Sequence, residues 1–411
     1  MTDHVAPSGS RQPAAEVDPA IGAQEQLHHA CLLGLQLKVS MQLGPQVVGD
    51  WMFRLFRRQH LEKFLSSFDK LGLTGLPHAV ACARYHVLSN DIGGVAVEYI
   101  EENDRKAWVR FRYPRWMYDG PTICGVPVEV SRGFLNGWYA HNGVSLGNPR
   151  LGFAWVSEDM TGELGFCAYF REYDEPLAEH ERLRFARDER PPPFDPARQP
   201  APPSAQWPAD RLAKAARNYA IEYVRNGIVE LAKVAGVAAV REHAGLAARL
   251  IGMQYRRVTA ERIGAIDGGA AQAADYLARM FRGMGDQARV LPAGGTAMQH
   301  AAAQGTAAQG TAAQGAAAAG AAVQGAAAGQ PADAPGAGAV QVLQQGLRIV
   351  RGLPAGEARL LFDCWQQLWV GALRSHAAIC ELQVAALDGG DPWAAEQLVW
   401  TVSTSTRRSV S

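Results

Sequence analysis

The stretch GGVAVEYIEENDRKAWVRFRY, residues 93–113, decides the fold class of this chain. Both of its arms alternate between apolar and polar side chains, a pattern typical of β-strands with one buried face. In the second arm Trp108 and Arg110 fall on one face, while Val109 falls on the other. Residues 102–104, Glu-Asn-Asp, are turn formers between the arms. The stretch therefore predicts an antiparallel pair of strands.

The residues before this pair continue the argument towards the N-terminus. Residues 83–90, ARYHVLSN, show the same alternation and extend the prediction to an antiparallel meander. Further upstream, residues 27–72 carry apolar side chains at three-to-four spacing, which predicts amphipathic helices. Pro45 suits the first turn of the second helix, and Gly72 suits its C-terminal end.

The residues after the pair complete the first domain. A helix is expected to begin near Pro127, and strands are expected over 151–158 and 164–173, joined by a turn at Asp159. The order helices, strands, helix, strands predicts an α+β domain over 27–180, with N-terminal helices packed on an antiparallel sheet.

The rest of the chain divides by composition. A proline-rich segment suits an extended linker, and the helical pattern then returns until a tract without Asp, Glu, Lys or Arg repeats the pentapeptide QGTAA. We read this tract as an insertion grown by repeat slippage, with an alanine-rich helix or an assembly segment as the alternatives. The expected segments are a disordered tail (1–26), the α+β domain (27–180), a charged and proline-rich linker (181–208), a helical region (209–289), the low-complexity insert (290–340), a helical region ending in a strand (341–405) and a tail (406–411).

The two halves of the chain share a plan. Each opens with long helices and later has a tryptophan-bearing helix, FLNGWYAHNG in the first half and FDCWQQLWVGALRSHAA in the second. Matching Asp159 to Asp388 makes the following segments run in parallel, with the low-complexity insert where the first half has its meander. A degenerate second copy of the domain is one interpretation. Two unrelated helical segments that share only Ala, Gly and Trp are the other.

Composition narrows the class of function. Forty Lys and Arg balance forty Asp and Glu, so the electrostatic footprint of a nucleic-acid-binding protein is missing. The six cysteines form no CxxC pair, and no metal, phosphate-binding loop or dinucleotide motif is expected, so we predict no cofactor. We also expect a cytoplasmic protein without membrane segments, with the helical half as the candidate surface for a homo-oligomer.

The candidate binding residues lie between 84 and 167. Arg112, Arg115 and Arg150 are candidate clamps for a carboxylate, because a guanidinium matches an oxyanion with two parallel hydrogen bonds. The alternative for each arginine is charge balance with a nearby carboxylate across strands. Trp116 and Asn142 complete the set of candidate substrate contacts.

Three residues are candidates for catalysis. His141 is the best single candidate for acid–base work, because an imidazole titrates near neutral pH. Its alternative is a cap on the C-terminus of the preceding helix. Asp119 is either a general base or a cap for the turn at Gly120. Cys124, in a loop near arginines, is either a nucleophile or an inert thiol.

The run GWYAHNGVSLGNPRLGFAWVSEDMTGELGFCAYF, residues 137–170, combines an aromatic helix, an acidic-glycine turn and a cysteine-bearing strand. With the preceding helices it resembles the bacterial L-2-amino-thiazoline-4-carboxylic acid hydrolase-like proteins, whose domain pattern is similar to vinyl-reductase-type small-molecule-binding domains. The resemblance covers roughly residues 27–176 and rests on Trp138, Gly162 and Cys167.

The resemblance implies a cytoplasmic hydrolase that opens a small cyclic amidine bearing a carboxylate. An arginine from the Arg112 and Arg115 region would then hold the carboxylate. His141 or Asp119 would activate water, or Cys124 would attack the amidine carbon. A non-catalytic sensor of small molecules and a structural assembly protein are the other two hypotheses. A sensor predicts an apolar cavity without convergent acid–base groups, and an assembly protein predicts an exposed apolar stripe on the helical half.

Overall fold

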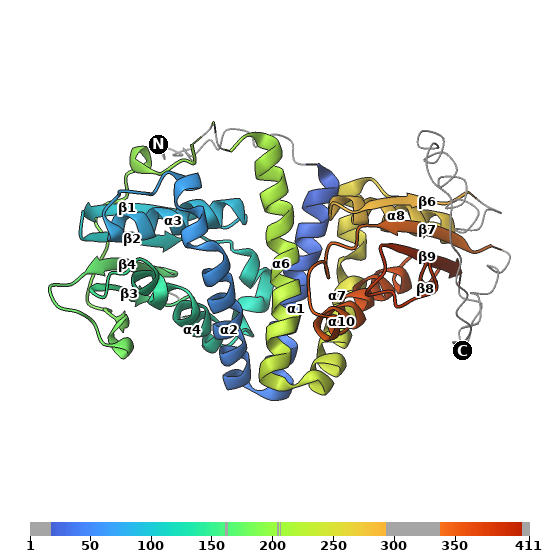
Figure 1. Ribbon diagram of the computed structural model, residues 1–411, viewed down its shortest axis with the longest axis horizontal. Helices are drawn as coiled ribbons and strands as arrows, with labels where there is room; N and C mark the ends of the chain where they lie inside the picture. Colours follow the sequence, from blue (N-terminus) through green and yellow to red (C-terminus); the bar gives the residue numbers. More distant parts are fainter. Residues whose placement is uncertain (1–17, 161–162, 204, 206, 293–337, 405–411) are drawn as a thin grey trace, which may run out of the picture.

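The computed structural model describes residues 18–160, 163–203, 205, 207–292 and 338–404. Two β-sheets lie at opposite ends of the molecule, with long helices standing between them (Figure 1). We call residues 18–203 the first unit and residues 209–404 the second unit. The predicted α+β class, with N-terminal helices against an antiparallel-rich sheet, is confirmed.

The first unit holds a five-stranded sheet in the order β1-β2-β4-β3-β5. All pairs are antiparallel except β3 with β5. Its elements are α1 (Pro19–Leu43), α2 (Pro45–Lys63), α3 (His78–Ile92), β1 (Val97–Asn103), β2 (Lys106–Phe111), α4 (Val128–Gly137), α5 (Asn142–Ser145), β3 (Leu151–Ser157), β4 (Cys167–Glu172) and β5 (Leu183–Phe185).

The second unit holds a four-stranded antiparallel sheet in the order β6-β7-β9-β8. Its elements are α6 (Ala209–Ala235), α7 (Val237–Ile263), α8 (Ala270–Gly283), β6 (Gln287–Val290), β7 (Val340–Gln345), α10 (Ala355–Arg374), β8 (Cys380–Ala386) and β9 (Gln397–Thr404).

Two predictions in the first half were wrong. Residues 83–90 belong to helix α3 and not to a strand. This helix packs against both the sheet and α6, so residues 79–83 are all buried and a one-sided helical pattern is missing. The expected tail is helical from Pro19 onwards, because the side chain of Asp18 accepts a hydrogen bond from the N–H of Ala20 and caps α1. Residues 1–17 lie outside the described residues.

Three further segments contain strands that were not predicted. They are the two helical regions of the second half and the linker. The segment 341–387 begins with β7 and ends with β8, the helical region ends with β6, and the linker contributes β5. Gln344 shows why β7 was missed. This polar residue is buried. Its burial is tolerated because its side-chain amide donates a hydrogen bond to Asp286 at 2.7 Å and accepts one from Trp400 at 2.7 Å. The insert lies, apart from its first and last few residues, outside the described residues, as do residues 405–411.

The two units repeat one topology. Apart from α5 and β5 of the first unit, each has three helices, a pair of strands, a helix and a second pair, and β6-β7-β9-β8 corresponds to β1-β2-β4-β3. Gly44 and Gly236 end the first helix of each unit with φ/ψ of 93°/163° and 81°/154°. Gly72 and Gly264 both adopt left-handed conformations, with φ of 69° and 64°. Each pair is separated by 192 residues. The internal duplication itself stays a prediction.

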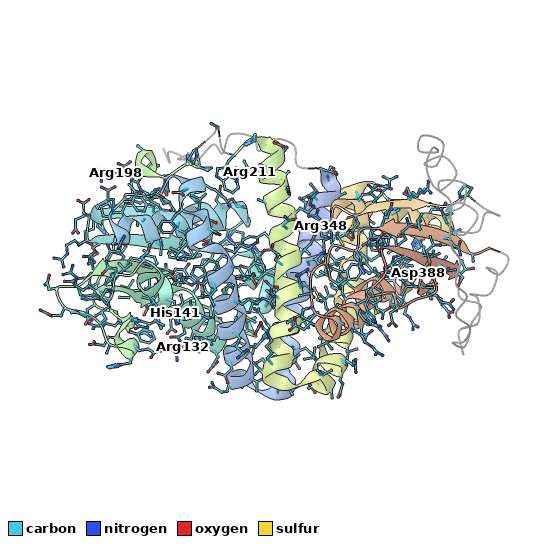
Figure 2. All side chains as sticks on the ribbon, in the orientation of Figure 1. Arg132, His141, Arg198, Arg211, Arg348 and Asp388 are labelled. Carbon is cyan, nitrogen blue, oxygen red and sulfur yellow. The ribbon has the colours of Figure 1, made fainter. Side chains whose placement is uncertain are left out.

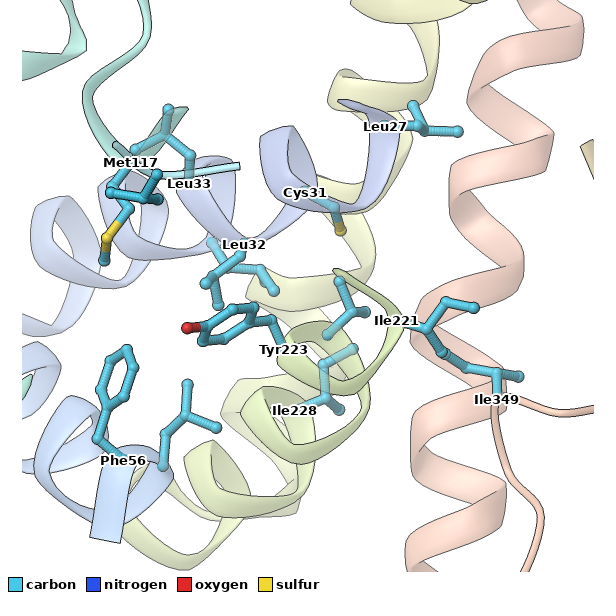
Figure 3. Close-up of a cluster of buried hydrophobic side chains, with 14 of the residues drawn as sticks. Leu27, Cys31, Leu32, Leu33, Phe56, Met117, Ile221, Tyr223, Ile228 and Ile349 are labelled. Atoms are coloured by element: carbon cyan, nitrogen blue, oxygen red, sulfur yellow. The ribbon is translucent and has the colours of Figure 1, made fainter. Parts of the chain in front are cut away.

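The first helix of each unit packs against helices of the other unit. Helix α1 lies against α7 and α8, and α6 lies against α2 and α3. Tyr223 of α6 lies in the shared core beside Leu32 of α1 and Phe56 of α2 (Figure 3). The indole N–H of Trp51 on α2 donates to the carbonyl of Gly227 on α6 at 2.7 Å. One core therefore runs through both units. Among the described residues, no helix combines the length and the apolar composition required to span a membrane.

Candidate functional site

The predicted catalytic histidine caps a helix. His141 lies in a short 3₁₀ turn after α4, and its Nδ1 lies 2.9 Å from the carbonyl of Asn136 in the last turn of that helix. Burial, with a smaller contribution from the Arg57 guanidinium, lowers the pKa of His141. The neutral ring therefore donates its Nδ1 proton to the helix end. This is the capping role that stood as the alternative to acid–base catalysis. Figure 2 labels His141.

Asp119 and Cys124 lie on a different surface. Both are exposed and belong to the loop between β2 and α4. The carboxylate of Asp119 accepts a hydrogen bond from the hydroxyl of Tyr255 on α7 at 3.4 Å. Its main-chain oxygen accepts from Thr122 inside the loop. None of the contacts among the described residues joins either side chain to His141, so the structure does not assemble the predicted catalytic group.

Asn142 is buried in a polar cluster of the core. Its amide donates to Nε2 of His86 at 2.9 Å, and the His86 ring stacks on Tyr139 with centroids 3.8 Å apart. Burial lowers the pKa of His86 well below its usual value, so the ring is a neutral acceptor. Asn142 thus orients a core histidine, away from the surface where a substrate would arrive.

The remaining aromatic candidate also belongs to the core. Trp116 stacks on His29 of α1, with centroids 3.9 Å apart and nearly parallel planes. Burial lowers the pKa of His29 to about 3, so the stack is between two neutral rings. This pair fastens the β2–α4 loop to the central helices.

Two of the predicted arginines are tied to carboxylates of their own sheet or loop. Arg112 pairs with Glu98 at 2.7 Å across β1 and β2, which is the charge balance that stood as its alternative. Arg115 and Asp159 form a buried ion pair, and each is only 4% exposed. Each guanidinium is therefore paired with a carboxylate of the protein.

Asp159 is the centre of a network, although the sequence suggested a simple turn residue. Besides Arg115, its carboxylate accepts hydrogen bonds from Tyr113 at 2.8 Å, Ser131 at 2.8 Å and Tyr118 at 3.2 Å. Four donors from the β2–α4 loop and from α4 therefore satisfy one buried carboxylate. The network closes this end of the first sheet and holds the loop in place.

The opposite end of the same sheet is open. A cleft of about 880 Å³ lies between the loop before α3, the loop before β3 and the segment after β4. Of the predicted residues, Arg150 lines it, together with His78, Asn148 and Glu172. Gly147, with φ of 66°, ends the preceding turn, and Asn148 accepts a hydrogen bond from the N–H of Arg150 at 3.1 Å. The Gly-Asn-Pro-Arg sequence thus builds the turn that presents Arg150.

A hydrogen-bonded chain connects the polar groups of the cleft. The amide of Asn148 lies 3.0 Å from Nδ1 of His78 and 3.0 Å from the Glu172 carboxylate. Arg150, whose side chain is half exposed, approaches Glu172 at 3.5 Å. Asp174 at the rim pairs with Arg105, which lowers the pKa of the Asp174 carboxyl. The cleft therefore presents both signs of charge to solvent.

Sequence reasoning found Arg150 but missed His78, Asn148 and Glu172. His78 follows Pro77 at the start of α3, and Glu172 ends β4. These residues are about seventy and twenty-four positions from Asn148, so only the sheet topology brings them together. The Asn-Pro turn was the available signal.

The described residues contain no cluster of three or more His, Cys, Asp or Glu side chains suited to a metal ion. Comparison of the chain with protein-family models, with curated proteins and with solved structures finds no match. The geometry of the cleft is therefore the basis for assigning a function.

Proposed function

We propose that the first unit is a small-molecule-binding domain whose ligand carries a carboxylate and a cationic C–N group. The observation that carries this proposal is the open cleft in which Arg150, His78, Asn148 and Glu172 meet. Ligand sites are concave and place a few polar groups at fixed positions, and this cleft has both properties.

The two signs of charge suit the two ends of such a ligand. Arg150 and the N-terminal turn of α3 form the positive side. The residue that precedes this helix, Pro77, provides no side-chain hydrogen bond to its free N–H groups. Glu172, Asp174 and Glu175 form the negative side. A carboxylate is expected at Arg150, and an amidinium or ammonium group is expected at the carboxylates.

This ligand class agrees with the resemblance to hydrolases of a carboxylate-bearing cyclic amidine. Binding is the part of that activity which the cleft supports. Hydrolysis stays a prediction, because His141, Asp119 and Cys124 lie away from the cleft and the imidazole of His78 is engaged by Asn148.

The test is calorimetric titration of the full chain with 2-amino-2-thiazoline-4-carboxylate. Two truncated probes, 2-amino-2-thiazoline and a thiazoline carboxylate without the amino group, measure each end separately. We expect Arg150→Ala to weaken the complete probe about tenfold and to leave the carboxylate-free probe unchanged. Glu172→Gln should show the reverse preference.

Arg112→Ala is the matched control, since Arg112 is a surface arginine paired with a carboxylate outside the cleft. Chromatography of the titrated samples reports any ring opening. Failure of the wild-type chain to bind at about 1 mM, or equal binding by all variants, would overturn the proposal. Turnover that depends on Arg150 and Glu172 would keep the site and change the class to a hydrolase.

A further inference from the structure

The two units differ in how the ends of their sheets are covered. In the first unit the Arg115–Asp159 network closes the end at the β2–α4 loop, while the end before α3 is the open cleft. At the equivalent end of the second unit, before α8, the buried Arg256 pairs with Asp267, whose side chain is 59% exposed. There Arg256 lies 3.0 Å from Asp267 and 3.2 Å from Nδ1 of His376. Asp267 is separated by 192 residues from Gly75, which lines the cleft of the first unit.

The other end of the second unit is open. The loop between β7 and α10 has nine residues, 346–354, whereas the loop between β2 and α4 has sixteen, 112–127. In the longer loop the Tyr113 ring fills the space beside Gly165, where a Cβ would lie 2.8 Å from the ring. The shorter loop, 346–354, has no aromatic side chain equivalent to Tyr113, and a pocket of about 700 Å³ lies in the corresponding place.

The turn between β8 and β9 also differs from its counterpart. Asp388, the residue matched to Asp159 from the sequence, is exposed and caps its own turn by accepting from the N–H of Gly390 at 3.0 Å. Asp388 is labelled in Figure 2, in the region of β8 and β9. No described contact draws the β7–α10 loop to it, and the pocket stays open between the two loops.

One wall of this pocket is apolar, and polar side chains form the rest of its lining. Leu347 and Val350 are buried at its base, Leu353 and Ala358 continue the wall, and Trp393 adds an aromatic face. An aromatic or aliphatic ligand body would bury apolar surface here, which is the main source of affinity in such sites.

The charges near the pocket favour an anion. Arg351 lines it, with one N–H donating to the carbonyl of Gly346 at 3.2 Å. Arg217 packs against Gly285, and the main-chain N–H of Arg348 bonds the carboxylate of the adjacent Asp286. Burial raises the pKa of Asp286 to about 6, and Arg348 and Arg351 partly oppose this rise.

Three guanidinium groups thus gather around one buried carboxylate. The Asp286 carboxylate accepts hydrogen bonds from the side-chain amide of Gln344 at 2.7 Å and from the main-chain N–H of Arg348 at 3.1 Å. Buried Nε groups of Arg217 and Arg348 have no hydrogen-bond partner among the described residues. Glu396 is the acidic side chain in the lining. The local balance is positive, so an anionic group is attracted to the side of Arg351.

We infer that the second unit has its own binding site, which takes an amphipathic carboxylate with an aromatic or aliphatic body. The body lies against Leu347, Val350 and Trp393, and the carboxylate lies at Arg351. This site is separate from the zwitterion-binding cleft of the first unit. The two sites therefore differ in chemistry and lie at non-equivalent ends of their units.

The test uses the full chain and 2-naphthoate, with uncharged 2-naphthamide as the matched probe, in calorimetric titrations. We expect naphthoate to bind the wild-type chain more tightly than naphthamide does. Arg351→Gln should weaken naphthoate about tenfold and leave naphthamide unchanged. Ala355→Trp, which fills the pocket from the exposed first residue of α10, should abolish binding of both probes.

Arg359→Gln is the control, since Arg359 is an exposed arginine of α10 that does not line the pocket. It should bind both probes like the wild type. Thermal melts check that each variant is folded. Absence of naphthoate binding at about 1 mM would overturn the inference. So would binding that survives both Arg351→Gln and Ala355→Trp.

Discussion

The indole N–H of Trp365 donates a hydrogen bond to Nε2 of His28 across 3.2 Å, joining α10 of the second unit to α1 of the first. His28 Nδ1 lies 2.7 Å from the carbonyl of Gln24, so the ring proton resides on Nδ1. Burial lowers the pKa of His28 to about 4, which keeps the ring neutral and able to accept. The histidine and the tryptophan are both buried, and they fix how the two units meet.

Trp365→Phe should destabilise the whole chain. The substitution removes the donor and leaves a buried imidazole nitrogen without a partner, which costs about 1–3 kcal/mol of unfolding free energy. Denaturant unfolding at about pH 7.5 measures the change. Trp207→Phe removes an indole donor that bonds the Lys70 carbonyl at a more exposed site, and it should cost less. Equal effects of the two substitutions would show that burial of the acceptor does not matter.

Stability should fall as the solution becomes acidic. Burial lowers the pKa of His28 to about 4, and of His29 and His60 to about 3. The unfolded chain therefore binds more protons, so stability is complete above about pH 6.5 and is lost as the pH falls towards these values. Each histidine contributes about 2 kcal/mol of loss between pH 6.5 and 5. His29→Phe, which keeps an aromatic ring beside Trp116, should have a shallower loss over that window in unfolding titrations.

Glu25 should act in the opposite direction. Burial raises its pKa from 4.5 to about 7, and the nearby Arg262 only partly compensates. The folded state therefore holds a proton that the unfolded state releases, and this contribution is complete below about pH 4.5 and lost as the pH rises through 7. Glu25→Gln should be more stable than the wild type at about pH 8, by roughly 1–3 kcal/mol. Below about pH 4.5 the two chains should be equally stable, and a constant difference would refute the role of charge.

Asp159→Ala should be among the most destabilising changes in the first unit. It leaves the buried Arg115 guanidinium without a counter-ion and three hydroxyl donors without an acceptor. Loss of one partner of a buried pair costs about 3–5 kcal/mol. Asp388→Ala at the matched turn of the second unit removes only a local cap and should cost about 1 kcal/mol or less. The measurement is the unfolding free energy of the two variants. A comparable loss for Asp159→Ala and Asp388→Ala would show that the Asp159 network does not stabilise the first unit.

The sequence predicted the four strands β1 to β4 of the first sheet, and it missed helix α3 and the strands β5 to β8. In residues 93–113 the alternation of apolar and polar side chains identified the pair β1 and β2, although both faces of these strands are largely buried. Helix α3 is apolar on nearly every side, so its period was misread. Strand β7 was missed because it follows the insert and contains the polar residue Gln344. The hydrogen bond from Gln344 to Asp286, which allows its burial, cannot be recognised in a single sequence.

The candidate site was harder to predict for a related reason. Arg112, Arg115 and Arg150 look alike in the sequence, yet their partners differ. Arg112 pairs with Glu98, and Arg115 pairs with Asp159, whereas Arg150 lines the open cleft. Which arginine is available depends on where the sheet ends fall, and this follows from contacts between residues far apart in the chain. The residue types therefore indicated arginine as the group that binds a carboxylate, and the sheet topology determined that Arg150 is the arginine in the cleft.

The packing of α10 on α7 gives the sharpest steric test. A Cβ on Gly371 would lie 1.9 Å from the carbonyl oxygen of Arg249, a main-chain atom that cannot move without shifting α7. Gly371→Ala should therefore separate the helices and lower the unfolding free energy by about 1–3 kcal/mol, despite the higher helix propensity of alanine. Gly245→Ala on α7 is the matched control, because its Cβ would meet only a flexible Gln367 side chain at 3.6 Å. That variant should be neutral or slightly more stable, by up to about 1 kcal/mol. Thermal and denaturant unfolding of both variants decide the point, since equal stability would mean that the helices do not approach through Gly371.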